Sequence, residues 1–61
     1  MKRSEFIRWL NLQGCLLARH GGRHDIYLNP QTGKKQPVPR HHEIDDQLVR
    51  HIKKQLGFSE N

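Results

Sequence analysis

The fold is decided by residues 15–28, CLLARHGGRHDIYL, in which two apolar runs flank a pair of glycines. Residues 15–20 and 23–28 have the composition typical of strands. Gly21 and Gly22 join them, and glycine accepts the positive φ values that tight turns require. The stretch therefore predicts a β-hairpin whose tip carries an arginine and a histidine.

A third strand is predicted directly after this hairpin. Residues 29–33, NPQTG, form a turn cluster in which proline presets φ and glycine allows the chain to reverse. Residues 34–39 then have the pattern of a strand, but Pro37 and Pro39 cannot donate hydrogen bonds to a neighbouring strand. This segment is therefore expected at an edge of the sheet.

An amphipathic helix is predicted before the hairpin, from about residue 5 to residue 13. Ser4 is a candidate N-cap, and Glu5 places a negative charge at the positive end of the helix dipole. Gly14 supplies the stop signal, since the left-handed conformation after a helix is easiest for glycine. The apolar side chains fall on one face at helical spacing: Phe6, Ile7, Trp9 and Leu10.

A second helix is predicted after Asp45, a good N-cap, with Asp46 in the first turn. Ile44 precedes the cap and is placed to act as a hydrophobic staple against Val49. Gly57 ends the helix, and Phe58 is expected to pack back on its last turn. The apolar stripe of this helix consists of Leu48, Val49, Ile52 and Leu56.

The predicted order is helix, three antiparallel strands, helix. Two amphipathic helices and a one-faced sheet predict a single two-layer α+β domain over residues 1–61, with both helices on one face of the sheet. Together with a basic surface, this order is the architecture of the double-stranded-RNA-binding fold.

The composition of the 61 residues limits the class of function. Eleven basic residues against six acidic ones give a net charge of +5, which favours polyanionic partners. The apolar content of 33% is too lean for a deep cofactor cavity, so no cofactor is expected. Cys15 is the single cysteine, which excludes an internal disulfide. With no signal peptide and no apolar run of membrane-spanning length, a cytoplasmic protein is expected.

His24 is the first candidate for chemistry. An imidazole after a glycine turn could take a proton from a ribose 2′-hydroxyl, because histidine generally titrates near neutral pH. Nearby cations would stabilise the charge that builds on the phosphoryl oxygens, and the nearest in this topology are expected to be Arg23, Lys34 and Lys35. The alternative is an exposed strand histidine without a role.

A metal site is the second candidate. His20 and His24 bracket the turn and could face each other across the hairpin, with Asp25 beside them. Alternation along a strand, however, puts Asp25 on the face opposite His24. Residues 41–43, HHE, have the character of a solvated loop. Because stable sites need several converging ligands, no metal is expected.

The second helix and the aromatic residues leave further alternatives open. Three basic residues on the helix could bind RNA phosphates or could equally form a solvated face: Arg50, Lys53 and Lys54. Trp9 and Phe58 are expected in the core, whereas Tyr27 could be a core residue or a stacking platform.

Taken together, these segments resemble the HicA toxins of bacterial and archaeal toxin–antitoxin pairs. The resemblance rests on the glycine–any–histidine motif of residues 22–24, GRH, one strand after the helix that ends at Gly14. It continues through the turn PQTG, residues 30–33, then Val38-Pro39 and the loop rich in histidine. It ends in LVRHIKKQLG, residues 48–57, and so covers nearly the whole chain.

The resemblance implies an mRNA interferase, a small endoribonuclease of double-stranded-RNA-binding-like fold that a HicB antitoxin holds inactive. The catalytic histidine of the family falls on His24 and its motif glycine on Gly22. The residue between them, usually a small hydroxyl residue, is Arg23 here. His24 would activate the 2′-hydroxyl without a metal. The cations expected to hold the RNA are Arg23, Lys34, Lys35, Arg40, Arg50, Lys53 and Lys54.

The acid that protonates the leaving 5′-oxygen stays open between His20, Lys35 and water. The expected partners are RNA and a HicB-type antitoxin, whose acidic surface would approach His24; neither a membrane nor a small-molecule cofactor is expected. An alternative function is a non-catalytic RNA-binding module, or a degenerate toxin that retains only partner binding.

Overall fold

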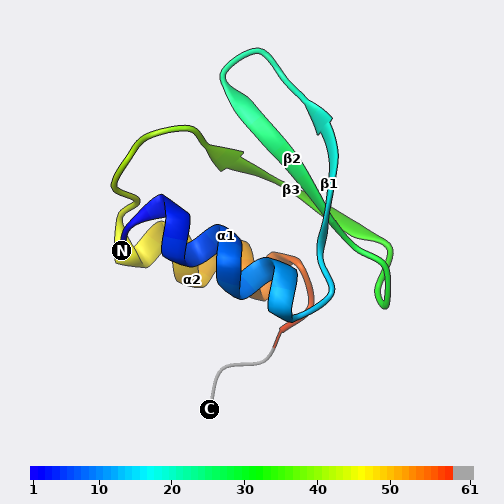
Figure 1. The fold of residues 1–61 in the computed structure, drawn as a ribbon. Coiled ribbons are helices and arrows are strands. Elements are labelled where there is room, and N and C mark those ends of the chain that lie inside the picture. Colours follow the sequence, from blue (N-terminus) through cyan, green and yellow to red (C-terminus); the bar gives the residue numbers. More distant parts are fainter. Residues whose placement is uncertain (59–61) are drawn as a thin grey trace.

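The computed structural model describes residues 1–58 and contains two helices and one sheet (Figure 1). The predicted order of helix, three antiparallel strands and helix is confirmed. The elements in chain order are α1 (Arg3–Leu12), β1 (Leu16–His20), β2 (His24–Asn29), β3 (Lys34–Pro39) and α2 (Asp46–Gln55).

The three strands are antiparallel neighbours in the order β1-β2-β3. In the pairing of β2 with β3, His24 lies opposite Pro39 at one end and Asn29 opposite Lys34 at the other. The proline-containing β3 is thus an edge strand, as its missing donors require. The register of β1 shifts between Leu17 and Arg19, an irregularity that the sequence pattern had not indicated.

Both helices cover the same face of the sheet (Figure 1). Side chains of β2 alternate between this covered face and the open one, because successive residues of a strand point to opposite sides. Asp25, Tyr27 and Asn29 are buried, whereas His24 is exposed. Tyr27, whose role the sequence left open, is therefore a core residue, at 6% exposure.

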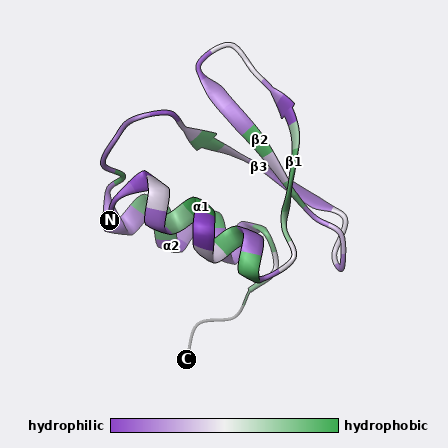
Figure 2. Cartoon of the chain, viewed as in Figure 1, coloured by the Kyte–Doolittle hydropathy of each residue, from purple (hydrophilic) through white to green (hydrophobic). Residues whose placement is uncertain are grey.

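The core lies between the helices and the sheet, and it is formed in part by buried apolar residues of α1 and α2. Figure 2 shows that hydrophobic and hydrophilic residues alternate along both helices. The prediction that Leu48 belongs to the stripe of α2 is wrong, since it is 37% exposed. Trp9 and Phe58 are only partly buried, and their rings pack edge to face at 5.0 Å between centroids. The buried apolar residues are Phe6, Leu10, Cys15, Tyr27, Val38, Ile44, Val49, Ile52 and Leu56.

The start of α1 differs from the prediction. The helix begins at Arg3, and Ser4 is not its N-cap; Lys2 occupies that position without a capping side chain. The reason is tertiary: the Arg3 amide donates to the carbonyl of His42, at 2.9 Å, so the backbone of the later loop satisfies this helix end. At α2 the prediction is confirmed, because the Asp45 side chain accepts from the Gln47 amide at 3.2 Å.

The turn between β2 and β3 is fastened to the end of α2. Asn29 Nδ2 donates to the Leu56 carbonyl at 2.7 Å, and Thr32 Oγ1 donates to the same oxygen at 3.0 Å. Gly57 follows with φ of 98°, and a Cβ there would lie 2.6 Å from the Thr32 methyl group. These contacts place the β2–β3 turn beside the end of α2 and leave the β1–β2 hairpin tip at the opposite end of β2.

Candidate functional site

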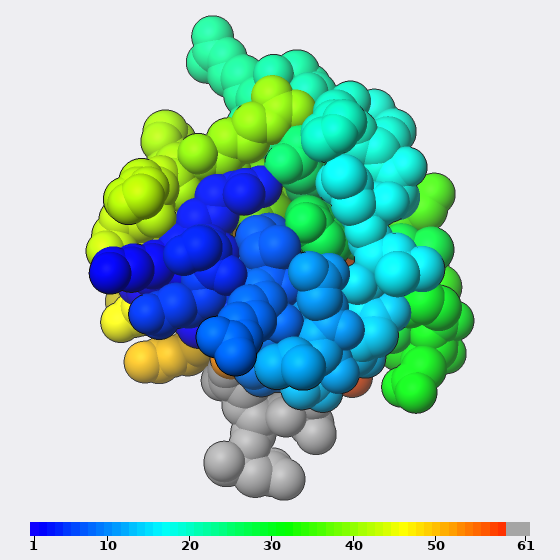
Figure 3. Space-filling model, in the orientation of Figure 1, coloured from blue at the N-terminus to red at the C-terminus, as the bar shows by residue number. Residues whose placement is uncertain are grey.

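The tip of the β1–β2 hairpin projects beyond the body of the molecule (Figure 3). Its backbone closes through the Gly21 amide, which donates to the His24 carbonyl at 2.7 Å. The prediction that the glycine pair allows a turn with positive φ values is wrong, because neither Gly21 nor Gly22 has a positive φ. Gly21 instead allows close approach, since a Cβ on it would lie 2.8 Å from the His24 carbonyl oxygen. A Cβ on Gly22 would meet nothing within 4 Å.

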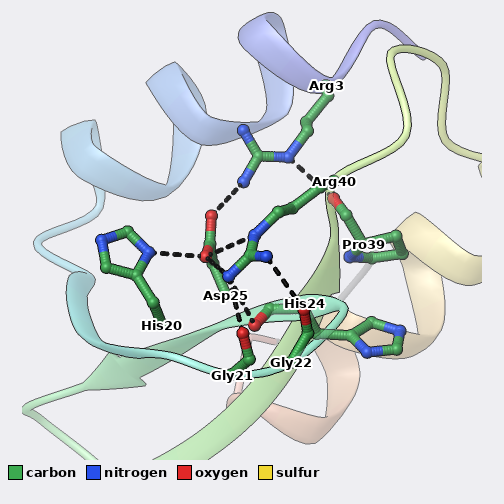
Figure 4. A network of polar contacts seen from close by, with 8 residues as sticks. All are labelled: Arg3, His20, Gly21, Gly22, His24, Asp25, Pro39 and Arg40. Atoms are coloured by element: carbon green, nitrogen blue, oxygen red, sulfur yellow. Dashed lines mark hydrogen bonds and ion pairs between the residues drawn. The ribbon is translucent and has the colours of Figure 1, made fainter.

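His24 is the first residue of β2 and is exposed on the face opposite Asp25. Its ring points away from the cluster of polar side chains on the other side of the strand (Figure 4). An exposed imidazole held on a strand next to a glycine loop is accessible to a large ligand such as an RNA strand.

Asp25 lies directly after His24 and is 8% exposed. Three side chains, those of Arg3, His20 and Arg40, bind its carboxylate (Figure 4). Arg3 Nη2 donates to Oδ2 at 2.7 Å, while His20 Nδ1 at 2.8 Å and Arg40 Nε at 3.0 Å share Oδ1. The hydrogen bonds from His20 and Arg40 lower the pKa of Asp25 to about 2, although burial alone would raise it. Asp25 is therefore a permanent anion at neutral pH.

Arg40 extends this cluster to the hairpin loop. Its Nη2 donates to the Gly21 carbonyl at 2.7 Å, and its Nη1 donates to the Gly22 carbonyl at 3.1 Å. Arg40 was expected among the RNA-binding cations, but most of its donors are used inside the protein. The position of Arg40 could have been predicted from antiparallel pairing, which puts the end of β3 beside the start of β2.

His20 and His24 do not face each other across the hairpin. His20 lies opposite Asp25 in the register, and the two imidazoles point to opposite sides (Figure 4). Because an ionised carboxylate only accepts hydrogen bonds, Nδ1 of His20 carries the hydrogen, which leaves Nε2 towards solvent. Within residues 1–58 no three histidine, cysteine or acidic side chains gather as a metal site would require.

The expected cations around His24 are only partly where the sequence placed them. Lys34 and Lys35 are not its neighbours, since they lie opposite Asn29 and Leu28 at the far end of β2. At ~3.3 Å per residue, Lys34 is roughly 16 Å along β3 from the position opposite His24. The error has a simple cause: the first residues after a hairpin turn pair with the last residues before it.

Other basic residues lie close to the hairpin tip or on the helical layer. Arg23, Arg40 and His41 line a surface hollow of about 370 Å³. On α2, Lys53 Nζ lies 4.2 Å from the centre of the Trp9 ring, a cation–π contact that occupies this lysine. Arg50 and Lys54 are exposed.

Fold and hairpin define a small domain of double-stranded-RNA-binding type that carries an exposed histidine directly after a short loop of two glycines and an arginine. The chain belongs to the HicA toxin family: the family model for the HicA toxin of bacterial toxin-antitoxin systems matches residues 3–58. The resemblance found in the sequence is thereby confirmed. No helix in the described part of the chain is both long and apolar enough to cross a membrane.

Relatives of known name are similar to this chain over nearly its full length. The probable mRNA interferase HicA 1 of Photorhabdus laumondii is 44% identical over 95% of this chain and 100% of its own. The probable mRNA interferase toxin HicA of Escherichia coli K12 is 39% identical over 97% of this chain and 100% of its own. The crystal structure of the E. coli HicAB toxin–antitoxin complex contains a chain with 42% identity and a TM-score of 0.80, and the match covers 95% of this chain and 100% of that one.

Proposed function

We propose that this chain is an mRNA interferase, a metal-independent endoribonuclease in which His24 is the general base. The observation that carries the proposal is the exposed imidazole of His24 at the hairpin tip, directly after Arg23, which lines a surface hollow together with Arg40 and His41. The names of the relatives, probable mRNA interferases at about 40% identity, support the same reaction.

The reaction starts at a ribose 2′-hydroxyl. The imidazole of His24 takes the hydroxyl proton, the 2′-oxygen attacks the adjacent phosphorus, and the bond to the 5′-oxygen breaks. The products are a 2′,3′-cyclic phosphate and a 5′-hydroxyl end. Arg23 is the cation best placed to stabilise negative charge on the phosphoryl oxygens, because it adjoins His24 and its side chain is exposed.

Water is the proposed source of the proton for the leaving 5′-oxygen. His20 is held by Asp25 on the other side of the hairpin, so its ring does not share the face of His24. Lys35 lies opposite Leu28, four residues along the strand from His24. Neither side chain is therefore near the place where the 5′-oxygen would leave.

The other basic residues have the proposed role of holding RNA at a distance from the bond that breaks. Arg50 and Lys54 are exposed on α2, and Lys34 and Lys35 are exposed at the far end of the sheet. Duplex RNA is recognised mainly through its backbone and 2′-hydroxyls, which suits dispersed, exposed cations. Lys53 contributes less to RNA binding because its ammonium group lies on the Trp9 ring.

A HicB-type antitoxin is the proposed protein partner, as suggested by the HicAB complex to which the fold is similar. An acidic antitoxin surface would cover His24 and Arg23 and speed association through opposite charge. The rate of complex formation should then fall as salt is raised, whereas a rate insensitive to salt would place the interface elsewhere.

The decisive experiment incubates the purified protein with a long transcript in the presence of a chelator. Cleavage by the wild-type chain that leaves 2′,3′-cyclic phosphate ends, and no cleavage by His24→Ala, is the expected result. Cleavage that needs a divalent ion would overturn the metal-independent mechanism. RNA binding without cleavage would instead support a non-catalytic RNA-binding module, and cleavage by His24→Ala would overturn the role of His24.

A further inference from the structure

We infer that Arg40 and Asp25 are positioning residues that set the place of His24, and that Arg40 is not an RNA ligand. The inference rests on the proposed function of His24 and adds to it the origin of the geometry on which catalysis depends. Arg40, which the sequence predicts among the cations that hold RNA, therefore has a different role.

Most of the donors of Arg40 are used within the protein. Nε donates to Asp25 Oδ1 at 3.0 Å, Nη1 to the Gly22 carbonyl at 3.1 Å and Nη2 to the Gly21 carbonyl at 2.7 Å. Nη2 also lies 2.9 Å from Asp25 Oδ1. One planar guanidinium thus binds a carboxylate on one edge and both glycine carbonyls on another, and it shares the single negative charge of Asp25 with Arg3.

Asp25 is itself held from the helical layer. Arg3 of α1 donates from Nη2 to Asp25 Oδ2 and from Nε to the Pro39 carbonyl, both at 2.7 Å. Pro39 is the register partner of His24. Arg3 and Arg40 therefore fasten β2 and β3 to each other and to α1 at the one level of the sheet where His24 stands (Figure 4).

Arg3, Asp25 and Arg40 together form a clamp, and this clamp acts on His24 through the backbone. The carbonyls bound by Arg40 belong to Gly21 and Gly22, the two residues that begin the loop. The Gly21 amide in turn donates to the His24 carbonyl at 2.7 Å. His24 and Asp25 are adjacent, so fixing the Asp25 side chain on the covered face fixes the direction of the imidazole on the open face. A loop of glycines without this clamp would allow the imidazole to move.

Loss of the clamp should lower kcat and leave RNA binding unchanged. A displacement of the base by about 1 Å is enough to reduce a rate by about 100-fold. A residue that binds phosphate behaves differently: its removal weakens RNA binding and lowers the salt dependence of binding by about one ion. The two roles therefore give opposite results for Arg40.

The test uses the full chain with three substitutions: Arg40→Lys, Arg40→Ala and Asp25→Asn. Arg40→Lys keeps the charge but lacks the planar fork that reaches both the carboxylate and the carbonyls. Arg8→Ala, at an exposed arginine of α1, is the matched control. Thermal unfolding of each variant establishes that it is folded at the assay temperature. If Asp25→Asn does not fold, Arg40→Lys decides the question.

Each variant is assayed for kcat and KM on one model RNA, and for RNA affinity against salt in a His24→Ala background, where the RNA stays intact. The expected result for Arg40→Lys is a kcat about 100-fold lower, with KM within about twofold of wild type. In Arg40→Ala, which removes the charge, the salt slope of RNA binding should be unchanged. Millimolar guanidinium should restore part of the activity of Arg40→Ala, an effect that a merely destabilised fold would not show.

Two outcomes would overturn the inference. One is a wild-type kcat in folded Arg40→Lys; the other is a raised KM in Arg40→Ala with a salt slope of RNA binding reduced by about one. Failure of the proposed function is recognised separately, because it requires that His24→Ala still cleaves RNA. If His24→Ala is inactive and Arg40→Lys is fully active, the role of His24 stands and the positioning role of Arg40 falls.

Discussion

The two glycines of the hairpin tip should respond differently to the same added methyl group, with a loss of stability at Gly21 and almost none at Gly22. In Gly21→Ala the new Cβ would lie 2.8 Å from the His24 carbonyl oxygen, a backbone atom that cannot rotate away. The loop must therefore open and lose the hydrogen bond from the Gly21 amide, now 2.7 Å long. In Gly22→Ala the Cβ would meet nothing within 4 Å, and the backbone there is not in the left-handed region.

The size of the effect follows from the two hydrogen bonds that the backbone of residue 21 would give up. The bond from its amide is worth about 1 kcal/mol net, and the charged bond from Arg40 to its carbonyl about 1.5–3 kcal/mol. Alanine lowers the entropy of the unfolded chain, which returns about 0.4–1 kcal/mol. Gly21→Ala should thus lower the free energy of unfolding by about 2 kcal/mol, or Tm by roughly 8–16 °C in a domain of this size. Gly22→Ala should stay within about 0.5 kcal/mol of wild type.

Thermal unfolding followed by circular dichroism, with urea unfolding as a second probe, measures both variants under the same conditions. RNA cleavage by Gly22→Ala adds a functional reading: since nothing inside the protein fills the space above Gly22, any loss of activity at full stability would report on the approach of RNA. A wild-type Tm for Gly21→Ala would refute the argument from close approach. Equal losses of stability in the two variants would refute it as well.

Three further predictions concern other parts of the molecule. Asn29→Ala removes the bond to the Leu56 carbonyl and should cost about 1–2 kcal/mol of stability in urea unfolding, without changing kcat. Because the pKa of Asp25 is lowered to about 2 in the folded chain, its stabilising contribution is complete above about pH 4 and is lost as pH falls towards 2. Asp25→Asn should therefore flatten the pH dependence of Tm in this range, and an unchanged profile would contradict the assignment. Lys54→Ala should weaken RNA binding and lower its salt slope by about one, with kcat unchanged; a fall in kcat alone would exclude a phosphate contact.

Much of the fold was predictable because its signals are local. The 3.6-residue spacing of apolar side chains in α1 and α2, the Asp45 cap and the proline–glycine turn before β3 each act within a few residues. The placement of His24 and Asp25 on opposite faces also followed from alternation along one strand. Where local reasoning was wrong, as at Ser4, a distant backbone carbonyl had satisfied the helix end in place of a capping side chain.

The surroundings of His24 were less predictable. Lys34 and Lys35 are close to the hairpin in sequence but lie at the other end of the sheet, because antiparallel pairing reverses the order of residues. The positions near His24 belong instead to Pro39 and Arg40, which lie at the far end of β3 in the chain.

From the sequence alone, the order of elements, the hairpin, the exposed histidine and the family of this protein could be determined, since each depends on neighbouring residues or on a short motif. The tertiary structure decided which groups surround that histidine. Arg3, Asp25 and Arg40 come from α1, β2 and the end of β3, and only the packing of the helical layer against the sheet brings them within hydrogen-bond distance. A carboxylate placed among cations from separate elements is a property of the folded chain, because no local pattern encodes which distant side chains will reach it.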